Sequence, residues 1–115
     1  MRLNDFQITP NFNLREFQCP CCHAVVLHRR LAAAMQRLRG LCARPLVVTS
    51  GYRCAPHNAA VGGAANCFHR RGLAADVAVP AGSQSLFREM AKEAGFARTI
   101  AYPERSFVHL EVSDE

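Results

Sequence analysis

The order of helical and extended patterns is the feature of this sequence that most constrains its fold. Residues 28–42 and 83–96 each place apolar side chains at helical spacing, which predicts two amphipathic helices. Short apolar runs with the composition of strands lie between and after them: PLVVTSGY, GLAADVAVP, RTIAY and SFVHLEV. Because helices and strands do not alternate strictly as βαβ units, the order predicts an α+β domain with helices packed on a small, mainly antiparallel sheet.

The length of 115 residues suits one domain with its own core, so we expect residues 1–115 to form a single unit. Residues 1–26 are expected to be an irregular lead-in that carries a cysteine cluster, with a short helical turn at LREF. No apolar stretch approaches the roughly 18 residues of a membrane span. The N-terminal residues also lack the pattern of a signal peptide. We therefore expect synthesis in the cytoplasm.

The net charge of +5 favours acidic partners without choosing among them. The basic residues are scattered, with only two adjacent arginine pairs, and no basic run marks a nucleic-acid arm. A zinc-stabilised nucleic-acid binder, which CPCCH and the pI of 9.2 would suggest, lacks a second ligand pair and a basic helix with interleaved aromatic residues. We expect a monomer that binds no nucleic acid.

Six cysteines are many for a chain of this length. Without a secretion signal, a disulfide framework is not the expected use. Cys19 and Cys22, with His23, could begin a structural zinc site, but the second half of such a motif is missing. Cys54 and Cys67 could complete it only if the fold brings them close. Reduced, partly buried thiols are therefore the favoured interpretation, with a second metal or a disulfide as the alternative.

Three residues are candidate metal ligands: His69, Asp76 and His109. In HRRGLAADV, Gly72 lets the chain turn so that the first two can point at one ion. In SFVHLEV, strand alternation places His109 and Glu111 on one face. Two imidazoles and one carboxylate leave a fourth zinc position for water, the arrangement of a catalytic site. From spacing alone, two unrelated hydrogen-bonded histidines explain the pattern equally well.

The stretch SGYRCAPHNAAVGGAANCFHRRGLAADV, followed by FVHLEV, resembles the zinc D-Ala-D-Ala carboxypeptidase/endopeptidase family, peptidase family M15. It is most similar to short phage and prophage members that cut peptidoglycan peptides, over roughly residues 10–113. The resemblance implies a small α+β fold shared with the hedgehog signalling domain and a bound Zn²⁺. It also implies hydrolysis of peptidoglycan peptide bonds next to D-amino acids, by a protein that reaches the cell wall through release or export.

Carried over by position, the resemblance matches His69, Asp76 and His109 to the family's three zinc ligands. Arg53, in SGYR, matches an arginine that pairs with substrate. Its planar, permanently charged fork suits the terminal carboxylate of D-alanine or a developing oxyanion.

Two departures from the family pattern affect the expected chemistry. Many relatives have a substrate-binding serine two residues before the first histidine ligand, where this chain has Cys67, a weaker hydrogen-bond donor. Several relatives place an acid three residues before the last histidine, where this chain has Ser106. The general base is then expected to be Glu111, which shares a strand face with His109, or Glu104 in the preceding turn. The alternative for Glu111 is a partner that orients a ligand imidazole.

The departure at Ser106 keeps a second function open, a zinc-binding cell-wall module of the same fold without hydrolytic activity. The sequence also does not separate a carboxypeptidase from an endopeptidase, because both use the same metal centre.

Overall fold

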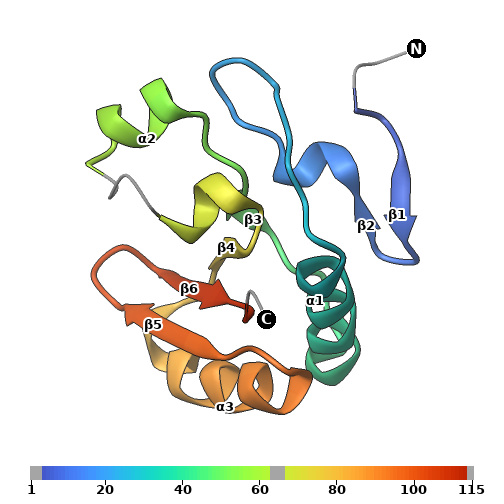
Figure 1. The fold of residues 1–115 in the computed structure, drawn as a ribbon. Coiled ribbons are helices and arrows are strands. Elements are labelled where there is room, and N and C mark those ends of the chain that lie inside the picture. The colour runs from blue at the N-terminus through green and yellow to red at the C-terminus, as the bar shows by residue number, and fades with distance from the viewer. Residues whose placement is uncertain (1–3, 63–66, 114–115) are drawn as a thin grey trace.

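In the computed structural model, which describes residues 4–62 and 67–113, a four-stranded antiparallel sheet forms the centre of the molecule (Figure 1). Its strands, in the spatial order β3-β4-β6-β5, are β3 (Val48–Ser50), β4 (Ala74–Ala78), β6 (Phe107–Glu111) and β5 (Arg98–Tyr102). The helices are α1 (Arg29–Cys42), α2 (Ala55–Ala60) and α3 (Gln84–Ala94), with 3-10 turns η1 (Leu14–Phe17), η2 (Phe68–Arg71) and η3 (Ala81–Ser83). This is the predicted α+β class. Residues 1–3, 63–66 and 114–115 lie outside the described part.

Helices α1 and α3 pack side by side on one face of the sheet (Figure 1). The apolar side of α1 buries Leu31, Met35 and Leu38 to 1% exposure or less, as its helical spacing predicts. Arg37 of α1 donates from Nε to the carbonyl oxygen of Ala94 of α3 at 2.6 Å, which joins the two helices at the end of α3. None of the helices in the described part of the chain has the length and apolarity needed to cross a membrane.

Strand alternation divides the sheet into an apolar face and a polar face. On β6, Val108 and Leu110 are fully buried in the core beneath the helices. The intervening His109 therefore points to the opposite face. On β4, Val77 joins the core and Asp76 takes the polar face by the same alternation. The face that the two helices leave uncovered thus carries the polar residues of both central strands.

The N-terminal segment is more ordered than the irregular lead-in that the sequence indicated. It contains a two-stranded antiparallel sheet, formed by β1 (Gln7–Thr9) and β2 (Phe12–Asn13). Strands of three and two residues are too short to show the alternation by which strands are recognised. The helical turn at LREF forms as expected, because Asn13 and Glu16 make a reciprocal capping box at the start of η1.

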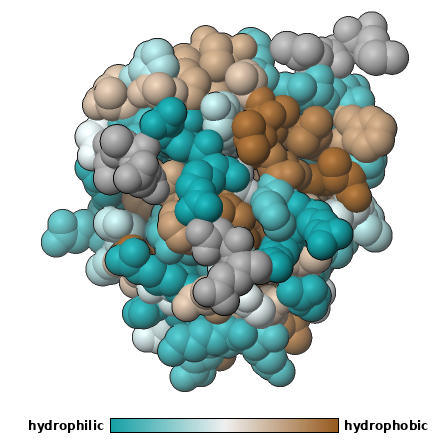
Figure 2. Space-filling view, in the orientation of Figure 1, coloured by the Kyte–Doolittle hydropathy of each residue, from teal (hydrophilic) through white to brown (hydrophobic). Residues whose placement is uncertain are grey.

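The surface differs in polarity between the N-terminal segment and α3. Figure 2 shows apolar side chains gathered at the upper right, over the N-terminal segment, and hydrophilic side chains over α3 at the bottom. Phe6 and Val26, which belong to the N-terminal part of the chain, are 66% and 47% exposed. Leu86 of α3 is also 62% exposed, so exposed apolar side chains are not confined to the N-terminal segment.

Gly72 closes the turn between η2 and β4 at a point where the chain has no room for a side chain. Its φ is +72°, in the left-handed region, and a Cβ would lie 2.5 Å from the carbonyl oxygen of Val26. The Gly72 carbonyl also accepts a hydrogen bond from the backbone N–H of His28 at 3.0 Å. The turn that precedes β4 is thereby fixed against the segment that leads into α1.

We expect Gly72→Ala to lower the free energy of unfolding by at least about 1–3 kcal/mol, because the substitution adds both backbone strain and a contact with backbone atoms. Gly40→Ala is the matched control. A Cβ at Gly40 meets nothing within 4 Å, so this change inside α1 should raise stability by about 0.5–1 kcal/mol. Denaturant unfolding of metal-free protein measures both values. Equal stability of the two variants would contradict this account of the turn.

Candidate metal centre

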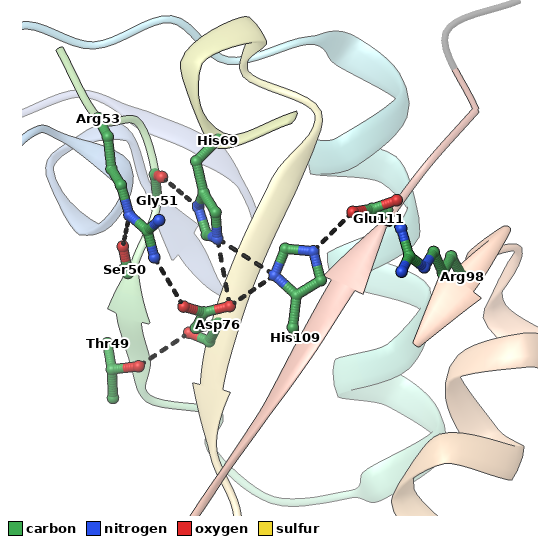
Figure 3. A network of polar contacts seen from close by, with 9 residues as sticks. All are labelled: Thr49, Ser50, Gly51, Arg53, His69, Asp76, Arg98, His109 and Glu111. Atoms are coloured by element: carbon green, nitrogen blue, oxygen red, sulfur yellow. Dashed lines mark hydrogen bonds and ion pairs between the residues drawn. The ribbon is translucent and has the colours of Figure 1, made fainter. Parts of the chain in front are cut away.

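Three elements bring the predicted ligands together on the polar face of the sheet (Figure 3). Asp76 of β4 and His109 of β6 are direct cross-strand partners, so their side chains emerge beside each other. His69 comes from η2, which the turn at Gly72 places over the strands. All three side chains are nearly buried, with exposures of 4%, 9% and 1% for Asp76, His109 and His69.

The distances among their polar atoms are those of a ligand set. Oδ1 of Asp76 lies 2.9 Å from Nδ1 of His109 and 3.2 Å from Nε2 of His69, and the two nitrogens are 3.2 Å apart. Donor atoms about 2.0–2.1 Å from a tetrahedral zinc ion lie about 3.3 Å from one another. Two imidazole nitrogens and one carboxylate oxygen are also ligand types that zinc prefers. The three side chains therefore fit a zinc ion with three protein ligands.

A backbone carbonyl sets the tautomer of His69. Nδ1 of His69 lies 2.7 Å from the carbonyl oxygen of Gly51, which can only accept a hydrogen bond. In the neutral ring Nδ1 then carries the proton, which leaves Nε2 as the nitrogen that can bind a metal ion beside Asp76 and His109. Sequence analysis missed this contact, because a backbone acceptor can be any residue type.

Glu111 has the corresponding place behind His109. Its Oε2 lies 2.7 Å from Nε2 of His109, while Nδ1 of the same ring faces Asp76. A carboxylate at Nε2 keeps the proton there and leaves Nδ1 as the ligating nitrogen. Arg98 Nη1 stands 3.9 Å from the same Oε2.

The cluster shifts the pKa of two of its members in opposite directions. Burial alone would raise the pKa of Asp76, but hydrogen bonds with His109 and His69 outweigh burial and lower it to about 2. Burial alone would lower the pKa of His109, but its hydrogen bonds to Asp76 and Glu111 raise it above the usual value. Without metal, the site therefore favours a negative Asp76 beside a protonated His109.

Arg53 binds the second oxygen of the shared carboxylate. Its Nη2 lies 3.3 Å from Oδ2 of Asp76, and its Nε donates to Oγ of Ser50 at 3.1 Å. The side chain is 16% exposed. Oδ1 is thereby left to the two histidines. Ser50 was not among the predicted site residues, although it lies in the same SGYR stretch as Arg53.

A cleft of about 280 Å³ opens onto this cluster. It is lined by Arg53, Val61, Gly62, Cys67, His69, Asp76, Ile100, Tyr102, Arg105, Phe107 and His109. Cys67, the predicted substrate contact, is therefore at the cleft. Glu111 and Glu104 are not among the described lining residues, and Glu104 instead borders a separate hollow in the turn 103–106.

Comparison with known proteins places nearly the whole chain in one group. A family model described as Peptidase M15 matches residues 10–111, which include every residue of the site described above. No curated protein matches the sequence at a significant level.

The lowered pKa of Asp76 predicts an acid-dependent loss of stability in the metal-free protein. Because the folded pKa of about 2 lies below the reference value of 3.8, the stabilisation is complete above about pH 4 and is lost as the pH falls toward 2. The loss should amount to roughly 2 kcal/mol. Denaturant unfolding of chelator-treated protein between pH 2 and 5 measures it.

Asp76→Asn should remove this part of the pH dependence, because the amide does not titrate. Asp5→Asn, which changes an exposed carboxylate, should retain it. An unchanged slope in Asp76→Asn would show that the carboxylate is not held as described.

Proposed function

The chain belongs to the peptidase M15 family, and from this premise we propose that it is a zinc-dependent peptidase that hydrolyses bonds next to D-amino acids in bacterial peptidoglycan. One observation carries the proposal. Nε2 of His69, Oδ1 of Asp76 and Nδ1 of His109 converge beside an open cleft, which is the donor set of a zinc site with one position left for solvent.

His69, Asp76 and His109 would hold the ion, which when bound supplies Lewis acidity toward a peptide carbonyl and makes a water molecule more acidic. Two neighbouring groups orient the histidine ligands. The Gly51 carbonyl and the Glu111 carboxylate each fix one imidazole with its ligating nitrogen toward Asp76.

We assign substrate binding to the cationic side of the cleft. The contacts of Arg53 with Asp76 and Ser50 engage Nη2 and Nε, and Nη1 is the donor that would meet a substrate carboxylate. Arg105 lines the same cleft. Two arginines at one cleft suit the terminal carboxylate of a D-alanine peptide, and Cys67 lies where it can contact the same substrate.

The position of Glu111 supports a positioning role more than a general-base role. Its Oε2 is engaged by Nε2 of His109, the ring nitrogen that faces away from Asp76. Glu104 remains the candidate proton acceptor, because its exposed turn adjoins Tyr102 and Arg105, which line the cleft.

A second function is favoured by one observation. Among the described residues that line the cleft, Asp76 is the only acid, and it is already a metal-ligand candidate. A zinc-binding cell-wall module without hydrolysis would need no proton acceptor there.

Mass spectrometry of purified muropeptides incubated with the protein decides between these functions. The peptidase should release fragments with zinc and none after chelation. Loss of one alanine residue would identify a carboxypeptidase, and conversion of cross-linked dimers to monomers would identify an endopeptidase. Zinc-dependent binding to peptidoglycan with no released fragment would establish the module and exclude the peptidase.

Glu111→Gln and Glu104→Gln separate positioning from proton transfer. If Glu111 orients His109, Glu111→Gln should weaken zinc affinity at this site by about 10–100-fold, with kcat largely restored by excess zinc. Glu104→Gln should lower kcat by about 100-fold or more with zinc affinity unchanged. Zinc titration and steady-state kinetics measure both. A kcat loss in Glu111→Gln that excess zinc does not restore would make Glu111 the proton acceptor.

A further inference from the structure

Four of the six thiols gather in a cluster apart from the candidate metal centre: Cys19, Cys21, Cys22 and Cys54. Their sulfur atoms all lie within 4.8 Å of one another. The first three come from the loop after η1, and Cys54 is the residue that precedes α2. Cys42 and Cys67 are outside the cluster.

The sulfur distances resemble those around a metal ion. Sγ of Cys19 lies 3.4 Å from that of Cys21 and 3.6 Å from that of Cys54, and the latter two are 3.2 Å apart. A disulfide would bring two sulfurs to about 2.05 Å. Four sulfurs at about 2.3 Å from a tetrahedral zinc ion stand about 3.8 Å apart. Neutral thiols are weak hydrogen-bond partners, so their mutual attraction does not explain such a gathering.

The backbone of the loop is shaped to present these thiols together. The N–H of His23 donates to the carbonyl of Cys19 at 2.8 Å, and the N–H of Cys19 donates to the carbonyl of Ala24 at 2.7 Å. Between them His23 adopts the left-handed region at φ +63°. This tight loop brings Cys21 and Cys22 back beside Cys19.

We propose that Cys19, Cys21, Cys22 and Cys54 form a second, structural metal site that binds zinc through four thiolates. With all four positions taken by protein, this site leaves none for water or substrate, and its role is to hold the chain together. Cys21 and Cys54 complete the half-motif that Cys19 and Cys22 begin in the sequence. The proposal does not depend on the proposed peptidase activity.

The site would fix a segment on which the candidate metal centre depends. Cys54 directly follows Arg53, which contacts Asp76, and the same segment supplies the Gly51 carbonyl that orients His69. The backbone N–H of Tyr52 also donates to the carbonyl of Phe17 at 2.7 Å, just before the cysteine loop. Zinc at the thiols would therefore clamp residues 51–54 against the N-terminal segment.

Metal analysis of protein purified under reducing conditions tests the site. Wild type should bind two zinc ions per chain. His109→Ala should retain one, and its cobalt(II) form should show the strong absorption of thiolate-bound cobalt. The double variant Cys21→Ser/Cys54→Ser should lose one zinc and that absorption, whereas Cys42→Ser and Cys67→Ser, the matched controls, should bind two.

A second measurement, made on unmutated protein, tests the site even if the double variant fails to fold. With zinc bound, alkylation followed by mass spectrometry should find the four clustered cysteines protected, and chelation should make them reactive. One zinc per chain in wild type, lost in His109→Ala, would overturn the proposal. So would cobalt-loaded His109→Ala without thiolate absorption, or a mass showing disulfides among the four cysteines. A protein that binds two zinc ions but releases no muropeptide fragment would contradict only the peptidase.

Discussion

The buried carboxylate of Asp76 is the group around which the polar half of this structure is arranged. At 4% exposure it can remain charged only if its oxygens are paired, because an unpaired buried charge is very costly. Oδ1 faces both histidines and Oδ2 faces Arg53. The partners come from η2, from β6 and from the loop after β3, so one side chain ties together three parts of the chain that are distant in sequence.

This arrangement follows from antiparallel pairing in the middle of the sheet. The register sets Asp76 opposite His109 and, on the same two strands, Val77 opposite Val108. The first pair lies on the polar face, while Val77 and Val108 are fully buried beneath α1 and α3. A shift by one residue on either strand would send its polar side chain into the core. The hydrophobic core thus fixes the geometry of the metal-ligand candidates, although the core side chains lie on the opposite face of the sheet.

The sequence predicted the features that depend on local patterns and missed those that depend on tertiary contacts. The α+β class, the two amphipathic helices and the two faces of β6 depend on periodicity, and they were predicted correctly. The grouping of His69, Asp76 and His109 came from motif spacing and family resemblance, and the structure brings these side chains together. Strand alternation also placed Glu111 on the face of His109, and orienting that imidazole was one of its two expected roles. The Gly51 carbonyl and the approach of Cys54 to the cysteine loop depend on folded geometry. No local pattern marks them, and β1 and β2 are too short to show one.

Residues 51–54 are the link between the two clusters of metal-ligating side chains. Three of these four residues contact one of the clusters: Gly51 the imidazole of His69, Arg53 the carboxylate of Asp76, and Cys54 the thiols of the N-terminal loop. Gly51 lies so close to the N-terminal segment that there is no room for a side chain, because a Cβ there would lie 2.6 Å from the backbone of Phe17. A segment held at both ends can place a carbonyl oxygen and a guanidinium with little freedom. Precise placement of such groups is what a metal centre requires of its surroundings. The thiol cluster would therefore serve the cleft through the position of this segment and without contact with a substrate.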